Sequence, residues 1–142
     1  MRPHRATEND WPDIEALLHA SSLSIDGIHE HLAQYLIVRD NAGLLGCAGV
    51  EQYDTTGVLR ALAVAQRARS AGLGELLLSA VVADGRQQGV ESIVLQTKTA
   101  SQYFARLGFM PIGFAALPPN VRESPEFNRS ESDIGVLMHI CL

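Results

Sequence analysis

The sequence predicts an α/β protein in which a mixed sheet carries helices on both faces. A chain of 142 residues has the usual size of one domain, so we expect a single domain over residues 1–142. Hydrophobic residues make up 46% of the chain and charged residues 19%, which is ordinary for a globular protein. Strand-like runs first follow one another and later alternate with helical runs. The predicted order is β-α-α-β-β-β-α-β-α-β-β.

Two helices are predicted before the first long strand. Residues 9–21 have apolar side chains at helical spacing. Asn9 or Asp10 can cap this helix, and Pro12 falls in its first turn. A shorter second helix is expected from Asp26 onward.

A hairpin and another strand follow these helices. Residues 35–40 and 44–53 are strand-like, and the Asn-Ala-Gly sequence at 41–43 between them is typical of a hairpin turn. A turn at 55–57 then leads into a strand over residues 58–65.

The second half of the chain alternates helices with strands. Its expected elements are a helix from Gly74, a strand over 92–97, a short helix ending at Gly108, and strands over 109–117 and 134–142. The 16-residue segment 118–133 contains three prolines and lies between the last two strands. Such a long loop in a small domain more often serves a function than not, and we expect it to cover a site.

Charge and composition exclude several classes of protein. The net charge of −5 and the lack of a basic stripe argue against a nucleic-acid partner. No apolar run reaches the length of about 18 residues that a membrane span needs, and we expect no membrane association and a cytoplasmic location. Cys47 and Cys141 are expected to be buried free thiols, and no metal site is expected.

A glycine-containing bend separates the predicted strand over 58–65 from the next helix. Arg69, Gly72 and Gly74 have the spacing R-x-x-G-x-G. The first amides of a helix lack intrahelical partners, and glycines let a phosphate come close to them. The segment is therefore interpreted either as a phosphate cradle, with Arg69 and Arg67 adding positive charge, or as a plain turn whose glycines only relieve crowding.

Two longer segments carry a family resemblance. The sequence "LRALAVAQRARSAGLGELLL" resembles the coenzyme-A-binding segment of the GCN5-related N-acetyltransferases (GNAT), and "TKTASQYFARLGFMPIG" is similar to the segment that follows it in that family. The resemblance spans nearly the whole chain and implies a mostly antiparallel sheet that splays open. Two branches look most similar, namely the acetyltransferases of arsenic-resistance operons, which we favour, and the acetyltransferase domain of amino-acid (glutamate) N-acetyltransferase.

The resemblance implies a site for acetyl-CoA as co-substrate, without a metal. The implied cofactor-binding residues are Leu62, Ala63 and Val64 for the pantetheine arm, Arg69, Ser70, Ala71, Gly72, Leu73 and Gly74 for the pyrophosphate, and Thr97 and Phe104 beyond them. Ser70 stands where many relatives have glycine, and its amide is still free to bind. The family also implies a homodimer formed through the C-terminal strands.

The candidate catalytic residues depart from the family pattern at one position. Phe104 stands where many relatives carry a tyrosine that protonates the departing thiolate, and phenylalanine has no proton to give. Tyr103 is the adjacent candidate, although one helical step rotates it by about 100°. Water, Thr97 or Thr99 are the alternatives. Glu51, on an otherwise apolar strand, is the candidate base, unless it is only a solvated carboxylate at a strand end.

Arg60 is a charge in the middle of a predicted strand. Simple alternation would place it with Val58, Leu62 and Val64, opposite a face that contains Leu59, Ala61 and Ala63. It could pair with Glu51, or it could hold the carboxylate of a substrate. The second interpretation gives an N-acetyltransferase that acts on the amine of a small molecule, an amino acid or its analogue. The alternative is a catalytically weak acyl-CoA-binding module of the same fold.

Overall fold

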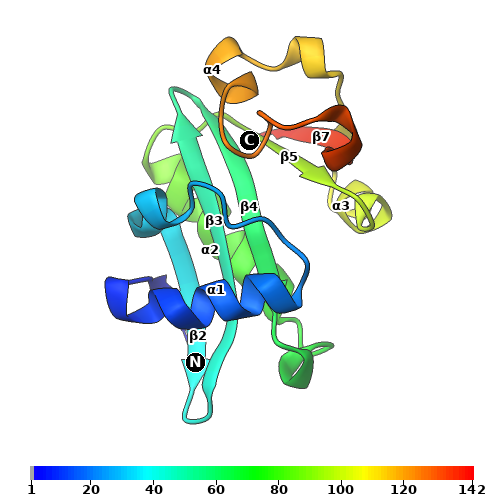
Figure 1. Cartoon of the computed structure of the whole chain (residues 1–142). Helices are drawn as coiled ribbons and strands as arrows, with labels where there is room; N and C mark the ends of the chain where they lie inside the picture. The colour runs from blue at the N-terminus through cyan, green and yellow to red at the C-terminus, as the bar shows by residue number, and fades with distance from the viewer. Residues whose placement is uncertain (1) are drawn as a thin grey trace.

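The computed structural model describes residues 2–142, except the side chain of Glu131, and contains one seven-stranded sheet with helices on both sides (Figure 1). The strands are β1 (His4–Arg5), β2 (Tyr35–Asp40), β3 (Gly43–Tyr53), β4 (Thr56–Val64), β5 (Ser92–Thr97), β6 (Met110–Pro111) and β7 (Val136–Cys141), in the spatial order β1-β2-β3-β4-β5-β7-β6. The α-helices are α1 (Trp11–Ala20), α2 (Leu73–Gln87), α3 (Ser101–Arg106) and α4 (Pro119–Arg122). Short 3₁₀ helices are η1 (Glu8–Asp10), η2 (His29–Gln34), η3 (Gln66–Ala68), η4 (Phe114–Ala116) and η5 (Glu131–Asp133). The predicted α/β class and the order of the elements are confirmed.

Three details differ from the sequence predictions. The helix expected from Asp26 is the 3₁₀ helix η2, which begins at His29. The strand expected over 109–117 is only β6, because Pro111 has no N–H to donate and the chain turns into η4 three residues later. Cys141, expected to be buried, is exposed at the end of β7, whereas Cys47 is buried; both thiols are free.

Apolar side chains on the two faces of the sheet hold the helices in place. Leu73, Leu77 and Val81 of α2 pack on one face. Ile14 and Leu18 of α1 pack on the other face. Burying each such side chain stabilises the fold by about 1.5–3 kcal/mol. A third cluster fixes the C-terminal segment, because Leu117, Val121 and Phe127 pack on Val58 of β4 and Val94 of β5.

β4 and β5 are the only parallel pair among the described strands, and they separate after three residue pairs. The pairs are Thr56 with Ser92, Gly57 with Ile93 and Val58 with Val94. Beyond them β4 continues to Val64 and β5 to Thr97, and Figure 1 shows the two strands diverging. The sheet therefore has an opening in its middle, as the splayed arrangement predicted.

A β-bulge in β4 changes which face its side chains take. Ala61 has a φ of +59°, and the register shifts between the pairs Gly49–Arg60 and Cys47–Ala63. After the bulge, Ala61 and Ala63 pack in the cluster with α1, whereas Leu62 and Val64 pack in the cluster with α2, where Leu59 already lies. The predicted alternation is therefore wrong. Arg60 lies on the same side of the sheet as Ala61 and Ala63.

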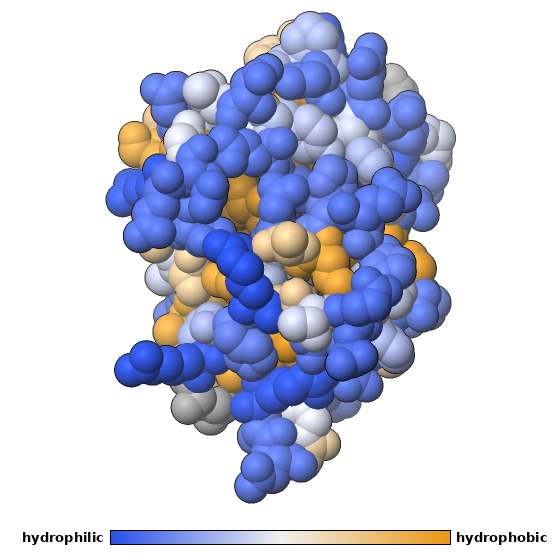
Figure 2. All heavy atoms as spheres, turned by 90° about the vertical axis from the view of Figure 1, so that its left-hand side faces the viewer, coloured by the Kyte–Doolittle hydropathy of each residue, from blue (hydrophilic) through white to orange (hydrophobic). Residues whose placement is uncertain are grey.

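The surface beside the β1–β2 edge is mostly hydrophilic, and hydrophobic residues show only in small areas between hydrophilic ones (Figure 2). In the part of the chain that the structure describes, no helix combines the length and the apolar character needed to cross a membrane. Among the same residues, no three His, Cys, Asp or Glu side chains come close enough to hold a metal ion.

Candidate active site

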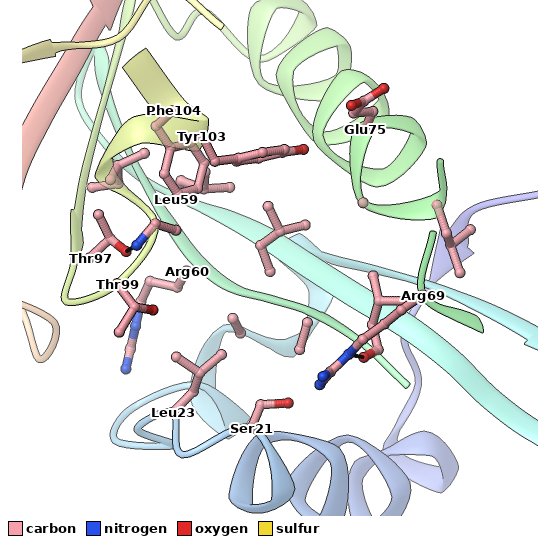
Figure 3. A pocket seen from close by; sticks show the side chains of 18 of the residues that line it. Ser21, Leu23, Leu59, Arg60, Arg69, Glu75, Thr97, Thr99, Tyr103 and Phe104 are labelled. Atoms are coloured by element: carbon pink, nitrogen blue, oxygen red, sulfur yellow. Dashed lines mark hydrogen bonds between the residues drawn. The ribbon is translucent and has the colours of Figure 1, made fainter. Parts of the chain in front are cut away.

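A cavity of about 680 Å³ opens where β4 and β5 separate. Its walls come from the loop after α1, from β4, from the bend before α2, from β5 and α3, and from one residue of the C-terminal segment (Figure 3). The lining residues are Ser21, Leu23, Ser24, Leu59, Arg60, Ala61, Leu62, Ala63, Val64, Ala68, Arg69, Ser70, Gly72, Leu73, Gly74, Glu75, Leu95, Gln96, Thr97, Thr99, Ala100, Tyr103, Phe104 and Glu126.

The bend before α2 presents a row of unpartnered amides. Gly72 and Ser70 have left-handed conformations, with φ of +76° and +71°. Within residues 2–142, none of the amides of residues 70–74 donates a hydrogen bond to another group of the chain. A β-carbon on Gly72 would meet nothing within 4 Å, so a side chain would not clash here. Glycine suits this position because of its left-handed backbone conformation. The free amides at the start of α2 make this end of the cavity suited to an anion.

The two arginines of the bend have different surroundings. Arg69 lines the cavity and donates from Nε to the Val64 carbonyl at 3.1 Å. Arg67 instead forms two hydrogen bonds with the carboxylate of Asp40, at 2.9 and 2.8 Å. Arg69 is therefore the one of this pair that adds positive charge to the cavity wall.

The aromatic residues of α3 form the wall opposite Arg69 (Figure 3). Phe104 is 7% exposed and packs edge-on against Phe109, with ring centroids 5.5 Å apart. Tyr103 also lines the cavity, and its hydroxyl lies 3.9 Å from where a β-carbon on Gly74 would be. Burial, and then the charge of Glu75, raises the pKa of Tyr103, so this phenol keeps its proton at neutral pH.

Thr97 lies in the same part of the site, at the end of β5. Its Oγ1 accepts a hydrogen bond of 3.0 Å from the Ala100 amide. The hydroxyl therefore satisfies a backbone donor just before α3 while the residue lines the cavity.

The other end of the cavity contains a buried guanidinium. The Arg60 side chain is 1% exposed. Its Nη1 donates to the Asp26 carbonyl at 2.5 Å and to Glu51 Oε2 at 3.4 Å, and its Nε lies 3.3 Å from Glu126 Oε1. Its Nη2 is buried without a hydrogen-bond partner among the described residues. A buried donor without a partner costs free energy, and a ligand's oxygen would supply the missing partner.

Glu51 is fully buried and is not one of the described residues that line the cavity. Its Oε2 accepts a hydrogen bond of 2.6 Å from the Tyr35 hydroxyl, besides its pairing with Arg60. Burial, and then the negative charge of Glu51, raises the pKa of Tyr35 well above its usual value. Glu51 thus reaches the cavity only through Arg60.

Glu126 lines the cavity, and the sequence did not single it out. Its Oε1 lies between two guanidinium groups, 3.3 Å from Arg60 Nε and 2.8 Å from Arg129 Nη2. Burial raises the pKa of Glu126, and the two arginines partly offset this effect. The segment around it has no periodicity or motif, so no sequence signal distinguishes it from the other acidic residues there.

The family model described as Acetyltransferase (GNAT) family matches residues 3–109, which is most of the chain. The chain belongs to this acetyltransferase family. It is therefore an acyltransferase, and the resemblance drawn from the cofactor segment is confirmed.

Two curated relatives of this GNAT protein are named amino-acid acetyltransferase. The protein of Mannheimia succiniciproducens is 26% identical over 133 residues, which cover 87% of this chain and 30% of that protein. The protein of Pectobacterium atrosepticum is 32% identical over 85 residues, which cover 58% of this chain and 19% of that one. The chain thus spans less than a third of the length of these relatives. They carry the name of one of the two branches that the sequence resembles.

Solved structures share the GNAT fold. N-acetylglutamate synthase from Neisseria gonorrhoeae, complexed with coenzyme A and N-acetyl-glutamate, superposes with a TM-score of 0.85 at 23% identity, over 99% of this chain and 34% of that one. Rv2747 from Mycobacterium tuberculosis, in complex with CoA and NLQ, has a TM-score of 0.82 at 17% identity, over 100% of this chain and 99% of that one. At these identities the likeness supports the fold alone.

Proposed function

We propose that this GNAT protein transfers the acetyl group of acetyl-CoA to the amine of an amino acid or a close analogue. The observation that carries the proposal is that one cavity joins the unpartnered amides of the bend to the buried guanidinium of Arg60. An anion-binding end and a carboxylate-binding end in one cavity suit a CoA thioester and an amino acid. The names of the curated relatives and the ligands of the similar structures agree with this choice.

Acetyl-CoA would lie in the opening between β4 and β5. The unpartnered amides of residues 70–74 would bind its pyrophosphate, with the Arg69 side chain beside them. The unpaired edge of β4 at Leu62, Ala63 and Val64 would pair with the pantetheine arm, since β5 no longer occupies that edge. Thr97 and Phe104 would contact the arm from the other side.

The amino acid would bind at the other end, with its carboxylate on Arg60. A planar guanidinium with a free Nη2 can accept one more oxygen. This orientation points the amine toward the middle of the cavity. Direct transfer from the thioester to the amine needs no protein nucleophile. Holding the two reactants close together would then supply much of the rate enhancement.

The thiolate that leaves would take a proton from Tyr103 in this proposal. The phenol lies across the cavity from β4 and keeps its proton at neutral pH because burial raises its pKa. Phe104, at the place where many relatives have tyrosine, would then serve as apolar packing beside the thioester.

Calorimetric titration of acetyl-CoA tests the cofactor end. We expect micromolar binding to the unmodified protein. Gly72→Glu places a side chain at a φ of +76° and a negative charge beside the pyrophosphate, so it should abolish binding. Gly113→Glu, at an exposed glycine with no neighbour within 4 Å of a β-carbon, is the matched control. If the Gly72→Glu variant bound acetyl-CoA as tightly as the unmodified protein, the proposed pyrophosphate site at the bend would be wrong.

A thiol-release assay with a panel of amino acids tests the acceptor end. Acetyl-CoA consumption should depend on the amino acid, and the corresponding amines without a carboxylate should react far more slowly. The alternative function, an acyl-CoA-binding module with little activity, is favoured by Phe104 in place of the usual tyrosine. Tight acetyl-CoA binding without acceptor-dependent thiol release would support that module and overturn the enzyme.

We further propose a cytoplasmic homodimer. Its free thiols, Cys47 and Cys141, fit a reducing compartment. Met110 of β6 and Val136 of β7 are 64% and 44% exposed at the C-terminal edge of the sheet, which suits a subunit contact. Sedimentation analysis should give twice the mass of the chain, and Met110→Asp should shift the protein to the monomer.

A further inference from the structure

We propose that Glu126 is the general base that takes a proton from the ammonium group of the acceptor amino acid. Arg60 would position the carboxylate of the same amino acid. The inference rests on the proposed acetyl transfer to an amino acid and names a catalytic residue for it. It replaces Glu51 in that role, because Glu126 lines the cavity and Glu51 does not.

The contacts of Glu126 leave one oxygen for the acceptor. Both of its ion pairs, with Arg60 and Arg129, go to Oε1. Among the described residues, no arginine forms an ion pair with Oε2, so this oxygen can face an ammonium group. Since Arg60 also has its free Nη2 at this place, one residue pair could hold both charged groups of an amino acid, the carboxylate on Arg60 and the ammonium on Glu126.

The surrounding charges suit a carboxylate that gains and loses a proton. Arg60 of β4 and Arg129 of the C-terminal segment face it, together with Glu51 of β3 and the Tyr35 hydroxyl of β2. The Gln96 side chain of β5 also lowers the pKa of Glu126. Burial is the largest effect on the pKa of Glu126 and raises it toward the range useful for a base; the charge of Glu51 also raises this pKa, and the two arginines partly offset the increase.

The proposed step balances in atoms and charge. Glu126 takes one proton from the ammonium, and the nitrogen forms a bond to the thioester carbonyl carbon. The carbon–sulfur bond breaks, the thiolate takes a proton from Tyr103, and the nitrogen loses its second proton to solvent. Glu126 returns its proton to solvent and Tyr103 regains one, so each turnover releases one amide, one CoA thiol and one proton.

The pH dependence of kcat/KM tests the role of Glu126. The rate should rise with pH as Glu126 ionises, and in Glu126→Gln it should fall by about 10²- to 10⁴-fold and lose this acidic limb. Glu123→Gln, an exposed carboxylate in the same segment, should match the unmodified protein. A Glu126→Gln enzyme that keeps the acidic limb and nearly the full kcat/KM of the unmodified enzyme would overturn the proposal.

The variant Glu51→Gln distinguishes Glu51 from Glu126 as the candidate base. The charge of Glu51 raises the pKa of Glu126, so its removal should move the acidic limb to lower pH without abolishing it. Loss of the limb in Glu51→Gln, with the limb kept in Glu126→Gln, would assign the base to Glu51 instead.

Two further variants keep the test informative if Glu126→Gln folds poorly. Glu126→Asp keeps the charge between the arginines and should retain the limb with a reduced kcat. Glu126→Ala leaves space beside two arginines, so added formate should restore part of its activity; no restoration at any formate concentration, in a folded variant, would contradict the role. An unmodified protein that binds acetyl-CoA but acetylates no amino acid would instead refute the proposed function, and the base with it.

Discussion

Gly27 and Pro125 touch beside Arg60, next to the end of the cavity where the acceptor is proposed to bind. A β-carbon on Gly27 would lie 2.7 Å from Pro125 Cγ, and Gly27 has a φ of +76°. The carbonyl of the preceding Asp26 accepts a hydrogen bond from Arg60, and the residue after Pro125 is Glu126. The loop after α1 and the C-terminal segment therefore meet directly over Arg60.

Gly27→Ala should weaken both the fold and acceptor binding. The left-handed φ and the contact with Pro125 together should cost about 1–3 kcal/mol of unfolding free energy. The KM for the amino acid should rise more than the Kd for acetyl-CoA, because the strain falls on the acceptor end. Urea unfolding and steady-state kinetics measure the two effects. Gly113→Ala, with an extended φ of −82° and open space around it, should change neither; an equal effect of both variants would contradict this explanation.

Tyr103→Phe should lower kcat by about 10²-fold, the lower end of what general acid catalysis contributes, because it removes only the proposed proton donor. The Kd for acetyl-CoA should stay the same, since the ring remains to line the cavity. Single-turnover measurements with a saturating amino acid would detect the change. A kcat equal to that of the unmodified enzyme would mean that water or a threonine hydroxyl protonates the thiolate.

Arg60→Met should destabilise the folded state by about 3–5 kcal/mol, because it leaves buried carboxylates without their cation. Glu126 keeps Arg129 in this variant, whereas Glu51 keeps only the Tyr35 hydroxyl. The double variant Arg60→Met, Glu51→Gln should therefore recover part of the lost stability. Chemical denaturation of the three proteins tests the coupling, and strict additivity of the two single changes would argue against it.

Ala61→Val should test the bulge in β4. A β-branched side chain is strongly disfavoured at a φ of +59°, and we expect a loss of about 1–3 kcal/mol. Ala61→Gly should be close to neutral, since glycine accepts this conformation but loses more entropy on folding. If the bulge directs Arg60 toward the acceptor, Ala61→Val should also raise the KM for the amino acid. Equal thermal stability of both variants would show that the bulge carries no strain.

The ion pair of Asp40 and Arg67 predicts a pH-dependent contribution to stability. Hydrogen bonds from Arg67 lower the pKa of Asp40 from 3.8 to about 2. Because the folded state holds the ionised form, the stabilisation is present above pH 3.8 and is lost as the pH falls through 2. The melting temperature of Asp40→Asn should thus be lower than that of the unmodified protein at pH 5, and the difference should shrink between pH 4 and pH 2. A difference that stays constant over this range would refute the assignment.

Local chemistry explains what the sequence could predict. The hairpin at 41–43, the proline in the first turn of α1, and the glycines of the bend are effects of neighbouring residues, and they lie where expected. The predicted cap of α1 is wrong, because Asp10 precedes the helix without a capping hydrogen bond and its carboxylate instead accepts from the Thr7 amide and Arg39. The bulge was missed because Ala61 gives no signal for a positive φ. Glu126 was missed because its place beside Arg60 depends on Val121 and Phe127 packing on β4 and β5, and such long-range packing leaves no pattern in the segment itself.

If acetyl-CoA binds as proposed, the separation of β4 from β5 links the stability of the chain to the supply of this co-substrate. Three residue pairs hold the two halves of the sheet together, and a bound pantetheine arm would act as a missing strand between them. Since the unfolded chain has no such site, acetyl-CoA at 100 times its Kd would stabilise the folded protein by about 2.7 kcal/mol. The lifetime of this protein against proteolysis should then follow the acetyl-CoA concentration around it.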